Sequence, residues 1–419
     1  MKRIPSLWIA AASALIALGT VDAARRPRYG GELRVEMRAA LRTLDPSVND
    51  TDAAQLVPAV FETLVRFDEK GDPQPGLAIS WSHDAARKRW VFAARPNIIL
   101  HNGAPWSPHG GVIEVPDDQP LPKILQEMAR SSNAIVVHGE DGSLIGTGPF
   151  RISHWEAEKS ATLAAYDGYW AGRPFLDAIE IRMGRSLRDQ ELDLESGKTD
   201  VAEILVTDAR RLRQKGVRVS STPLIETLAL VFENPAVPET TREALALSID
   251  RATINNVLLQ KQGEPSAALL PHWLSGYSFL FPASRNIARS KQLAAGSPTL
   301  AFAYDRQDPI LTAIGERIAV NASEAGITLR SAAGTIDVRL VRLPIVSRDP
   351  WTALEDLAGR LKFPLPVSDL FEAEKALLSG YRVIPLVHLP EMWAVSGVVR
   401  NWPRLADVWL DPLGSKERP

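Results

Sequence analysis

The chain has 419 residues, of which 45% are hydrophobic and 23% charged, and this ordinary globular composition allows two or three lobes with separate cores. A formal net charge of −2, without a basic cluster interleaved with aromatic residues, argues against binding to nucleic acid or anionic lipid. Cysteine is absent, which excludes disulfides and leaves the core alone to stabilise the fold.

The N-terminus has the three-part layout of a secretory signal peptide. Lys2 and Arg3 precede an apolar run from Leu7 to Leu18, and small residues follow up to Ala23. The apolar run is shorter than the roughly 20 residues that span a bilayer. We expect cleavage after Ala23 and a periplasmic protein, and without a cysteine we expect no lipid anchor.

Strands and helices alternate along the remaining chain, which predicts an α/β protein. Strands are predicted, in chain order, at Gly31–Arg38, Arg87–Arg95, Val112–Val115, Lys159–Asp167, Phe175–Gly184, Asp200–Val206, Glu226–Asn234, Thr299–Tyr304, Thr335–Leu343 and Tyr381–Leu389. Helices are predicted at Ser186–Ser196, Pro238–Gln262, Pro309–Ala325, Pro350–Leu361 and Ser368–Ser379. Proline and glycine are dense between Pro96 and Pro122, so that segment is expected to be loop around its one short strand.

Catalytic patterns are missing from the sequence. The segment Glu195–Asp200, ESGKTD, lacks the upstream glycine of a phosphate-binding loop, because Leu192 stands there, and a helix-ending glycine is favoured. No Gly-x-Ser-x-Gly elbow occurs, and the acidic pair Asp117 and Asp118 lies in a Pro-rich loop. We therefore expect no enzyme and no cofactor.

Metal ligation is not favoured either. The seven histidines form no His-x-x-x-His or His-x-His pair, and without thiolates a closed zinc site is excluded. His101, His109 and Glu114 could meet in a loop, but surface or capping roles are favoured by their spacing. Several tryptophans sit at turns, where they could line a cleft, although core packing is the alternative for each.

Seven motifs in succession resemble one family. They are YGGELRV, LRTLDPSVNDTDAAQLVPAVFETLVRFDEKGDPQPGLAISW, NIILHNGAPW, the Gly-Thr-Gly-Pro-Phe strand with its Tyr-Trp-x-Gly-x-Pro turn, GKTDVAEI, NPAVPETTREALALSIDRATI and VIPLVHL. Together they resemble the extracytoplasmic solute-binding proteins that serve peptide and nickel ABC importers. On this resemblance, the turn and strand unit Ile145–Pro174 is scaffold of the main lobe and not a site.

The resemblance implies a type II-like periplasmic-binding-protein fold with two lobes, a discontinuous main lobe and a reduced third subdomain. The expected main lobe comprises 24–57, 146–227 and 390–419, after a signal peptide at 1–23. The small subdomain would be 58–145 and the second lobe 228–389. A hinge motion would enclose the ligand between the lobes.

Two departures from the family pattern bear on the ligand. After Trp106 the chain lacks the family's helical stretch, so the small subdomain is expected to be shortened and the cleft more open. Peptide-binding relatives place an aspartate three residues before an acidic-Pro pair, where this chain has Val346. A buried ammonium would lack a counter-charge there unless Asp349 substitutes for it.

Candidate ligand-binding residues follow the positions that contact ligand in relatives. They are Ala39, Ala40 and Leu41 through their backbone groups, Phe232 and Asn234 at the end of a strand, Val346, Asp349 and Trp351 on the specificity loop, and His388 on the returning strand. Trp273 and Trp393 are added on aromatic character alone.

The expected function is the periplasmic substrate-binding component of an ABC importer, which delivers its solute to a permease. The solute class stays open among peptide-like molecules, metal chelates and oligosaccharides, and a monomer is expected. The alternative is an interaction or sensory protein that retains the fold without transport.

Overall fold

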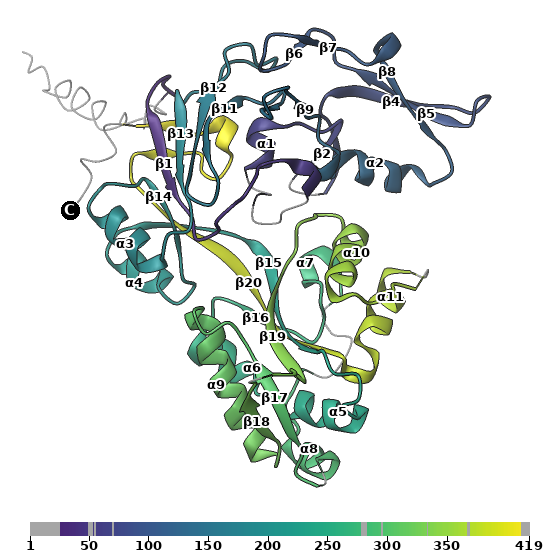
Figure 1. Ribbon diagram of the computed structural model, residues 1–419, viewed down its shortest axis with the longest axis vertical. Coiled ribbons are helices and arrows are strands. Elements are labelled where there is room, and N and C mark those ends of the chain that lie inside the picture. Colours follow the sequence, from purple (N-terminus) through teal and green to yellow (C-terminus); the bar gives the residue numbers. More distant parts are fainter. Residues whose placement is uncertain are drawn as a thin grey trace, which may run out of the picture.

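The computed structural model describes residues 26–411, apart from 49–52, 54–55, 69–70, 278–282, 295, 333 and 367–368. The predicted signal peptide, 1–23, lies outside the described residues. Figure 1 shows two large bodies joined by two long strands, with a smaller third body beside the upper one. In the part of the chain that the structure describes, no helix is both long enough and apolar enough to cross a bilayer.

One mixed sheet runs through both large bodies. Its strand order is β11-β12-β13-β1-β14-β20-β15-β19-β17-β18, and β16 pairs with β20. These strands are β1 (Glu32–Glu36), β11 (Phe150–Glu156), β12 (Ser160–Ala165), β13 (Ala178–Arg182), β14 (Val201–Ile204), β15 (Arg218–Phe232), β16 (Glu264–Pro265), β17 (Thr299–Ala303), β18 (Thr328–Ser331), β19 (Val338–Pro344) and β20 (Val383–Val395). β20 runs antiparallel to both β14 and β15, so it belongs to both bodies.

The upper body is built on the parallel strands β1 and β13. Ile179 and Ile181 of β13 are buried, as the period-two pattern predicts, and they pack in one core with Leu33 and Val35 of β1. The predicted helix Ser186–Ser196 is confirmed as α3 (Leu187–Glu195). The hydroxyl oxygen of Ser186 accepts from the amide of Asp189 at the N-cap.

The lower body places helices on both faces of its part of the sheet. Side chains of β15 alternate, so Leu228 and Leu230 face one core while Ala229 faces the other. The first core is covered by α5 (Glu239–Ser248), α8 (Ile287–Leu293) and α9 (Pro309–Glu324), and the second by α10 (Pro350–Leu361) and α11 (Leu370–Leu378). The predictions for α9, α10 and α11 are confirmed to within two residues.

The third body is a small antiparallel unit with its own core. Its strands are β2 (Val65–Phe67), β3 (Pro73–Pro75), β4 (Ala78–Asp84), β5 (Arg89–Ala94), β6 (Ile98–Ile99), β7 (Pro105–Trp106) and β8 (Val112–Pro116), followed by α2 (Leu121–Ala129). Phe92 is fully buried at its centre, against Ile124 and Leu125 of α2. No element was predicted at α2, and this helix forms one wall of the site described below.

Short elements complete the described chain. They are α1 (Val57–Val60), β9 (Val137–His138), β10 (Leu144–Ile145), α4 (Ala209–Gln214), α6 (Arg251–Thr253), α7 (His272–Ser275), β21 (Val399–Arg400) and β22 (Trp409–Leu410), together with the π-helix Ile254–Leu258 and 3-10 turns at Pro46–Val48, His109–Gly111, Ser131–Asn133, Ser379–Tyr381 and Leu405–Asp407.

The predicted single helix Pro238–Gln262 is wrong, because the chain breaks after α5. Ile249 leaves the helical region with ψ of 126°, and Asp250 caps a new start by accepting from the amide of Thr253 at 2.9 Å. Arg251 then lies buried, and its guanidinium donates to the carbonyl of Pro385 at 2.9 Å. The apolar spacing continues through the break. One straight helix would not let Asp250 cap a helix start and also bury Arg251 with its guanidinium hydrogen-bonded, so the chain forms two separate helices.

Candidate functional site

A polar cavity of about 210 Å³ lies where all three bodies meet. The upper body contributes Asp45, Pro46, Ala53 and Val57, and the third body contributes Phe67, Gln126, Ala129, Arg130, Ser131 and Ser132. The lower body closes it with Val346, Ser347, Arg348, Asp349, Thr352 and Asp356. Because its walls come from three segments far apart in the sequence, its shape depends on how the bodies are arranged.

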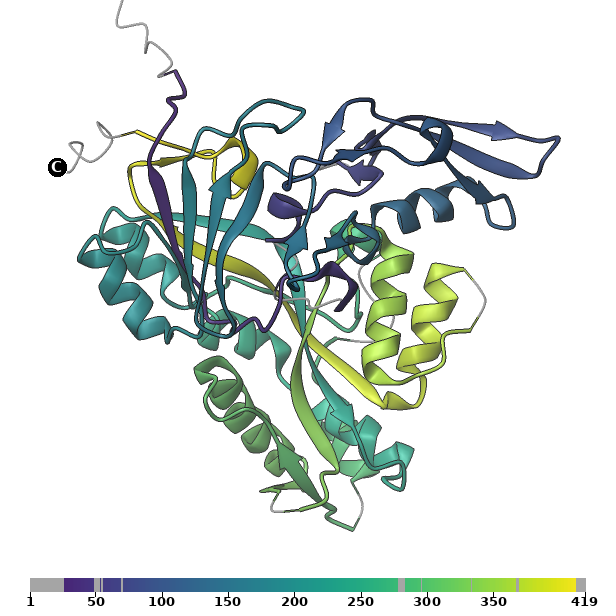
Figure 2. The same ribbon diagram turned by 45° about the horizontal axis from the view of Figure 1, so that its top comes forward.

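A second, apolar cavity of about 460 Å³ adjoins the first. Its walls are mainly apolar side chains of the third body and the lower body: Pro73, Leu121, Pro122, Leu125, Trp273 and Leu274. Four residues line both cavities, namely Phe67, Gln126, Arg348 and Asp349. The two spaces therefore form one divided cleft between α2 and the N-terminus of α10, whose relative positions Figure 2 shows.

Polar contacts cross this cleft from α2 to α10. The side-chain amide of Gln126 donates to the carboxylate of Asp349. The guanidinium of Arg130, just after α2, donates to Glu355 at 2.9 Å and lies 3.7 Å from Asp356. These contacts hold the third body against the lower body.

The geometry of Asp349 follows from its place at the start of α10. One carboxylate oxygen accepts from the amide of Thr352 at 2.7 Å, which caps the helix, and the other accepts from Gln126. Pro350 occupies the first helical position, where its missing N–H costs nothing. The cap thus fixes one side of the carboxylate and leaves the other directed at the cleft.

Two acidic residues of the polar cavity, Asp45 and Asp356, have pKa values shifted in opposite directions. Burial disfavours the charged form of Asp45, but hydrogen bonds from His138 and Ser47 outweigh it and hold the pKa of this carboxyl below its usual value. Burial raises the pKa of Asp356, although Arg130 opposes this shift. The cavity therefore combines a firmly ionised carboxylate with one that takes up a proton more readily.

Trp273 reaches the apolar cavity from the short helix α7. Its indole N–H donates to the carbonyl of Leu224 at 2.9 Å, and 43% of the residue is exposed. Behind it, the buried carboxylate of Glu374 accepts from the amide of Leu270 at 3.1 Å and from the hydroxyl of Tyr277 at 2.6 Å. The indole N–H is already paired, so Trp273 presents its ring to the cavity.

Of the candidate residues, the structure brings Trp273, Val346 and Asp349 to the cleft. Trp351 is the second residue of α10, where its indole N–H donates to Glu355 at 2.8 Å and its ring packs on the core covered by α10 and α11. It supports the carboxylate that pairs with Arg130, and it does not line either cavity.

The backbone candidates lie at the base of the upper body and line neither cavity. The carbonyl of Ala39 accepts from the amide of Gly184 at 3.1 Å, and that of Leu41 accepts from Glu158 at 2.7 Å. Ala40, between them, is exposed.

The remaining strand candidates are also structural in their contacts. Phe232 is 2% exposed in the core covered by α5, α8 and α9. The side-chain amide of Asn234 donates to the carboxylate of Asp337 at 2.7 Å. Trp393 is buried in the upper core against Trp402.

His388 is buried at the centre of β20 and lines neither of the two cavities. The hydroxyl of Thr227 donates to the carbonyl of Leu269 at 2.7 Å, so Nδ1 of His388, 2.9 Å from that hydroxyl, must be the donor. Nε2 is buried without a hydrogen-bond partner among the described residues, and burial lowers the pKa of His388 to about 3. The imidazole is therefore neutral at neutral pH.

Sequence reasoning missed Gln126, Arg130 and Arg348 as cleft residues. Arg348 lies on the loop that was selected for specificity, two residues after Val346, so its charge was a usable signal. Gln126 and Arg130 follow a segment dense in proline and glycine, and nothing local indicates that they face α10.

Two further ionic clusters lie outside the cleft. At the junction of the large bodies, Arg342 donates to Asp308 at 2.7 Å and also contacts Glu226, while Arg38 lies 3.3 Å from Asp308. This cluster ties β15 and β19 to the N-terminus of α9.

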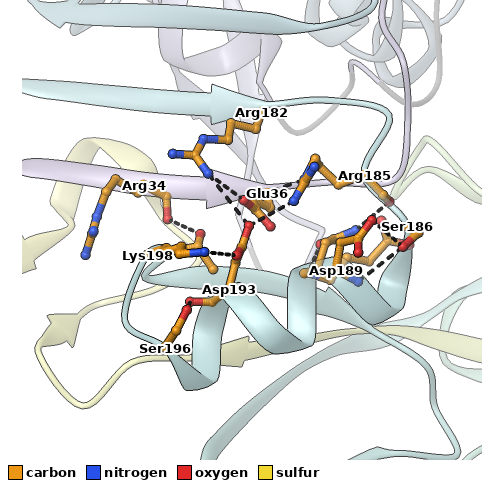
Figure 3. Close-up of polar contacts among 12 residues, drawn as sticks. Arg34, Glu36, Arg182, Arg185, Ser186, Asp189, Asp193, Ser196 and Lys198 are labelled. Carbon is orange, nitrogen blue, oxygen red and sulfur yellow. Dashed lines mark hydrogen bonds and ion pairs between the residues drawn. The ribbon is translucent and has the colours of Figure 1, made fainter.

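The other cluster, in Figure 3, surrounds the fully buried Glu36. Burial and the neighbouring Asp193 raise the pKa of Glu36, while Arg182 and Arg185 oppose that shift. Asp193 lies on α3 and Glu36 on β1, and Arg182 and Arg185 each lie within 4 Å of both carboxylates, so the two arginines hold the helix on the sheet.

Metal ligation has no support in the described residues, among which no group of three potential ligands gathers. His101 instead accepts from the amide of Gly146 at 3.2 Å through Nδ1 and donates to the carbonyl of Gly148 at 3.0 Å. Glu114 pairs with Arg89. The loop cluster considered from the sequence does not form.

The family model that matches describes the bacterial extracellular solute-binding proteins, family 5, and it covers residues 114–331. Among curated proteins, the peptide transport periplasmic protein SapA of Salmonella typhimurium is 29% identical over 146 residues, 31% of this chain and 25% of SapA. The nickel-binding protein NikA of Staphylococcus aureus is 24% identical over 167 residues, 38% of this chain and 34% of NikA. The matched sequence thus spans about a third or less of these relatives.

Solved structures match over nearly the whole length. The Escherichia coli murein tripeptide binding protein MppA superposes with a TM-score of 0.78 at 17% identity, covering 92% of this chain and 99% of MppA. Its unliganded open form gives a TM-score of 0.65 at 16% identity, with 92% and 98% covered. At these identities the likeness concerns the fold. The chain superposes less well on the unliganded open form of MppA than on the other MppA structure.

Proposed function

This chain belongs to the bacterial extracellular solute-binding proteins of family 5, and from that premise we propose that it is the substrate-binding component of an ABC importer. It captures a small solute in the cleft between α2 and α10 and presents the closed form to a permease. The observation that carries the proposal is the divided cleft, whose walls come from all three bodies and which is closed by direct contacts between them. Family members are extracytoplasmic binding proteins, and we extend to this chain a cleaved signal peptide at 1–23 without a lipid anchor.

For the lobes of the protein we propose the boundaries predicted from the sequence. The main lobe is 24–57, 146–227 and 390–419, the small subdomain 58–145, and the second lobe 228–389. The pairing of β15 with β20 shifts register on both sides of Leu224, which supports a hinge at that point. Bending there would separate α10 from α2 and open the cleft.

The proposed ligand contacts include residues predicted from the sequence and residues identified only from the structure. Trp273, Val346 and Asp349 line the cleft, and Gln126, Arg130 and Arg348 are added from the structure. The other candidates stay predictions, and Phe232, His388 and Trp393 are buried. Binding rather than catalysis is proposed, since family 5 consists of substrate-binding proteins.

The test is the thermal unfolding midpoint of the purified protein against solute classes. The panel contains di- to pentapeptides, amino-blocked peptides, nickel–histidine complexes and oligosaccharides. A ligand at 100 times its dissociation constant adds about 2.7 kcal/mol of stability, enough to raise the midpoint by a few degrees.

A variant separates cleft binding from unspecific stabilisation. Val346→Arg places a large charged side chain in the polar cavity and should abolish the shift produced by the best solute. Its matched control is Val320→Arg, at a residue that is 51% exposed on α9. No shift with any class would contradict transport and favour an interaction or sensory protein.

A further inference from the structure

The divided cleft carries one pair of charges without charged partners. The carboxylate of Asp349 has both oxygens occupied, by the amide of Thr352 and by Gln126. Among the described residues, the guanidinium of Arg348 makes one hydrogen bond, 3.4 Å to the carbonyl oxygen of Asp68. A guanidinium has five N–H donors, so most of the hydrogen-bonding capacity of Arg348 is open to a ligand.

The other cation in the described lining of the cleft, Arg130, already pairs with carboxylates. Arg130 lies 3.1 Å from Glu127 and 2.9 Å from Glu355. Arg348, in contrast, is exposed and lines both cavities. Within the described lining, it is the cation that lacks a carboxylate partner.

The larger cavity beside Arg348 suits an apolar body. Leu121, Leu125 and Leu274 face it together with the ring of Trp273, whose N–H is already paired. Such walls would leave a ligand charge without hydrogen bonds, so the charged group of a bound solute must lie at the edge. Arg348 lies at that edge.

Size is limited by the contact that divides the cleft. Gln126 and Asp349 meet between the two cavities and line both. The apolar cavity, at about 460 Å³, is at the small end of the volumes typical of ligand pockets, roughly 300–1,000 Å³. An extended chain would have to break the contact between Gln126 and Asp349.

We propose that the solute is a compact organic anion, with its apolar part in the cavity lined by Trp273 and its acidic group paired with Arg348. This inference rests on the proposed function and names the ligand class for the same cleft. Arg348 selects the charge of the ligand, and the contact between Gln126 and Asp349 limits its length.

Three probes with one apolar body test the charge. They are N-acetyl-L-leucine, an anion, N-acetyl-L-leucinamide, which is neutral, and L-leucinamide, a cation. Isothermal titration of the purified protein should give a dissociation constant for the anion about tenfold lower than for either of the others, the gain expected of one charge-assisted pair. Equal or tighter binding of the neutral or cationic probe would overturn the proposal.

Two arginine variants show whether Arg348 is responsible. Arg348→Gln should bring the anion and the neutral probe to within about twofold of each other, since the tenfold preference was the charge-assisted pair. Arg188→Gln changes an exposed arginine of α3 that makes no ion pair with the described residues, and it should leave the tenfold preference intact. Because Arg348 is exposed, both variants are expected to keep the wild-type melting midpoint.

Length is tested with an N-acetylated octapeptide ending in leucine. The wild-type protein should bind it at least about tenfold more weakly than N-acetyl-L-leucine, the cost of one lost cleft contact. Gln126→Ala should narrow that difference, and an unchanged difference would overturn the size limit.

The outcomes separate this inference from the proposed function. A solute found in the thermal panel whose affinity is the same in Arg348→Gln leaves the importer component standing and removes the ligand class. Absence of binding by every solute and every probe overturns both.

Discussion

At the scale of single residues, His388 is the group whose charge state the fold controls most strongly. Its pKa is lowered to about 3, because burial excludes the charged form. In the unfolded chain a histidine has a pKa of about 6.5. Between these values the unfolded state binds a proton that the folded state refuses, so stability is intact above about pH 6.5 and is lost as the pH falls towards 3.

His388→Gln should remove this contribution to acid lability. The amide can donate to Thr227 as Nδ1 does, and it takes up no proton. Between pH 6 and pH 4 the wild-type free energy of unfolding should fall by about 1.4 kcal/mol per pH unit more steeply than that of the variant. Urea unfolding at several pH values measures both slopes.

A second histidine provides the control for that experiment. His154 is exposed on β11, so His154→Gln should leave the wild-type slope unchanged. Parallel slopes for wild type and His388→Gln would show that His388 titrates normally in the folded protein.

The next scale is that of elements, where α11 positions the segments on either side of α7, the short helix that carries Trp273. Glu374 on α11 is fully buried and accepts from two consecutive backbone amides and from Tyr277. Those two amides make no other hydrogen bond among the described residues. The carboxylate therefore supports the wall of the apolar cavity from behind.

Removing this support should cost stability and loosen the cavity wall. Glu374→Ala leaves two buried amides unpaired and should lower the free energy of unfolding by about 2–4 kcal/mol. Glu374→Gln keeps an acceptor for them and should cost about 1 kcal/mol or less. Urea unfolding measures both, and equal losses would mean that the amides find other acceptors.

The elements also show what the sequence can predict. Ile179 and Ile181 define β13 by their alternation, and the Pro350 start defines α10, so these were correctly predicted. The predicted helix ends early because Asp250 caps a new helix start at Thr253, and the buried Arg251 beside it contacts Pro385, 134 residues away, which no local pattern indicates.

The cleft was less predictable for the same reason. Gln126 and Asp349 are 223 residues apart, and only the packing of the third body on the lower body joins them. Val346 and Asp349 were identified from a motif, whereas α2 followed a segment whose proline and glycine predicted loop. Local patterns define elements, but the cleft lies between elements.

For the whole molecule, the balance between open and closed arrangements depends on the contacts that cross the cleft. Arg130→Ala removes the contacts with Glu355 and Asp356, which are partly exposed and so are worth about 1 kcal/mol together. The ratio of closed to open molecules without ligand should fall about fivefold.

Small-angle X-ray scattering measures that shift as a larger radius of gyration without ligand. Saturating solute should restore the compact value, since the ligand favours the closed arrangement. Arg188→Ala is the matched control and should scatter as wild type does. An Arg130→Ala curve identical to wild type would mean that these contacts do not govern closure.

The position of β20 also governs the order in which the molecule can be made. β20 is the last long strand of the chain, yet it lies between β14 and β15, and it completes the hydrogen bonding of both. During synthesis, each large body waits with an open sheet edge until residues 383–395 emerge. Neither large body can complete its sheet before the other, so both are expected to finish folding late in synthesis, when the same strand, β20, becomes available.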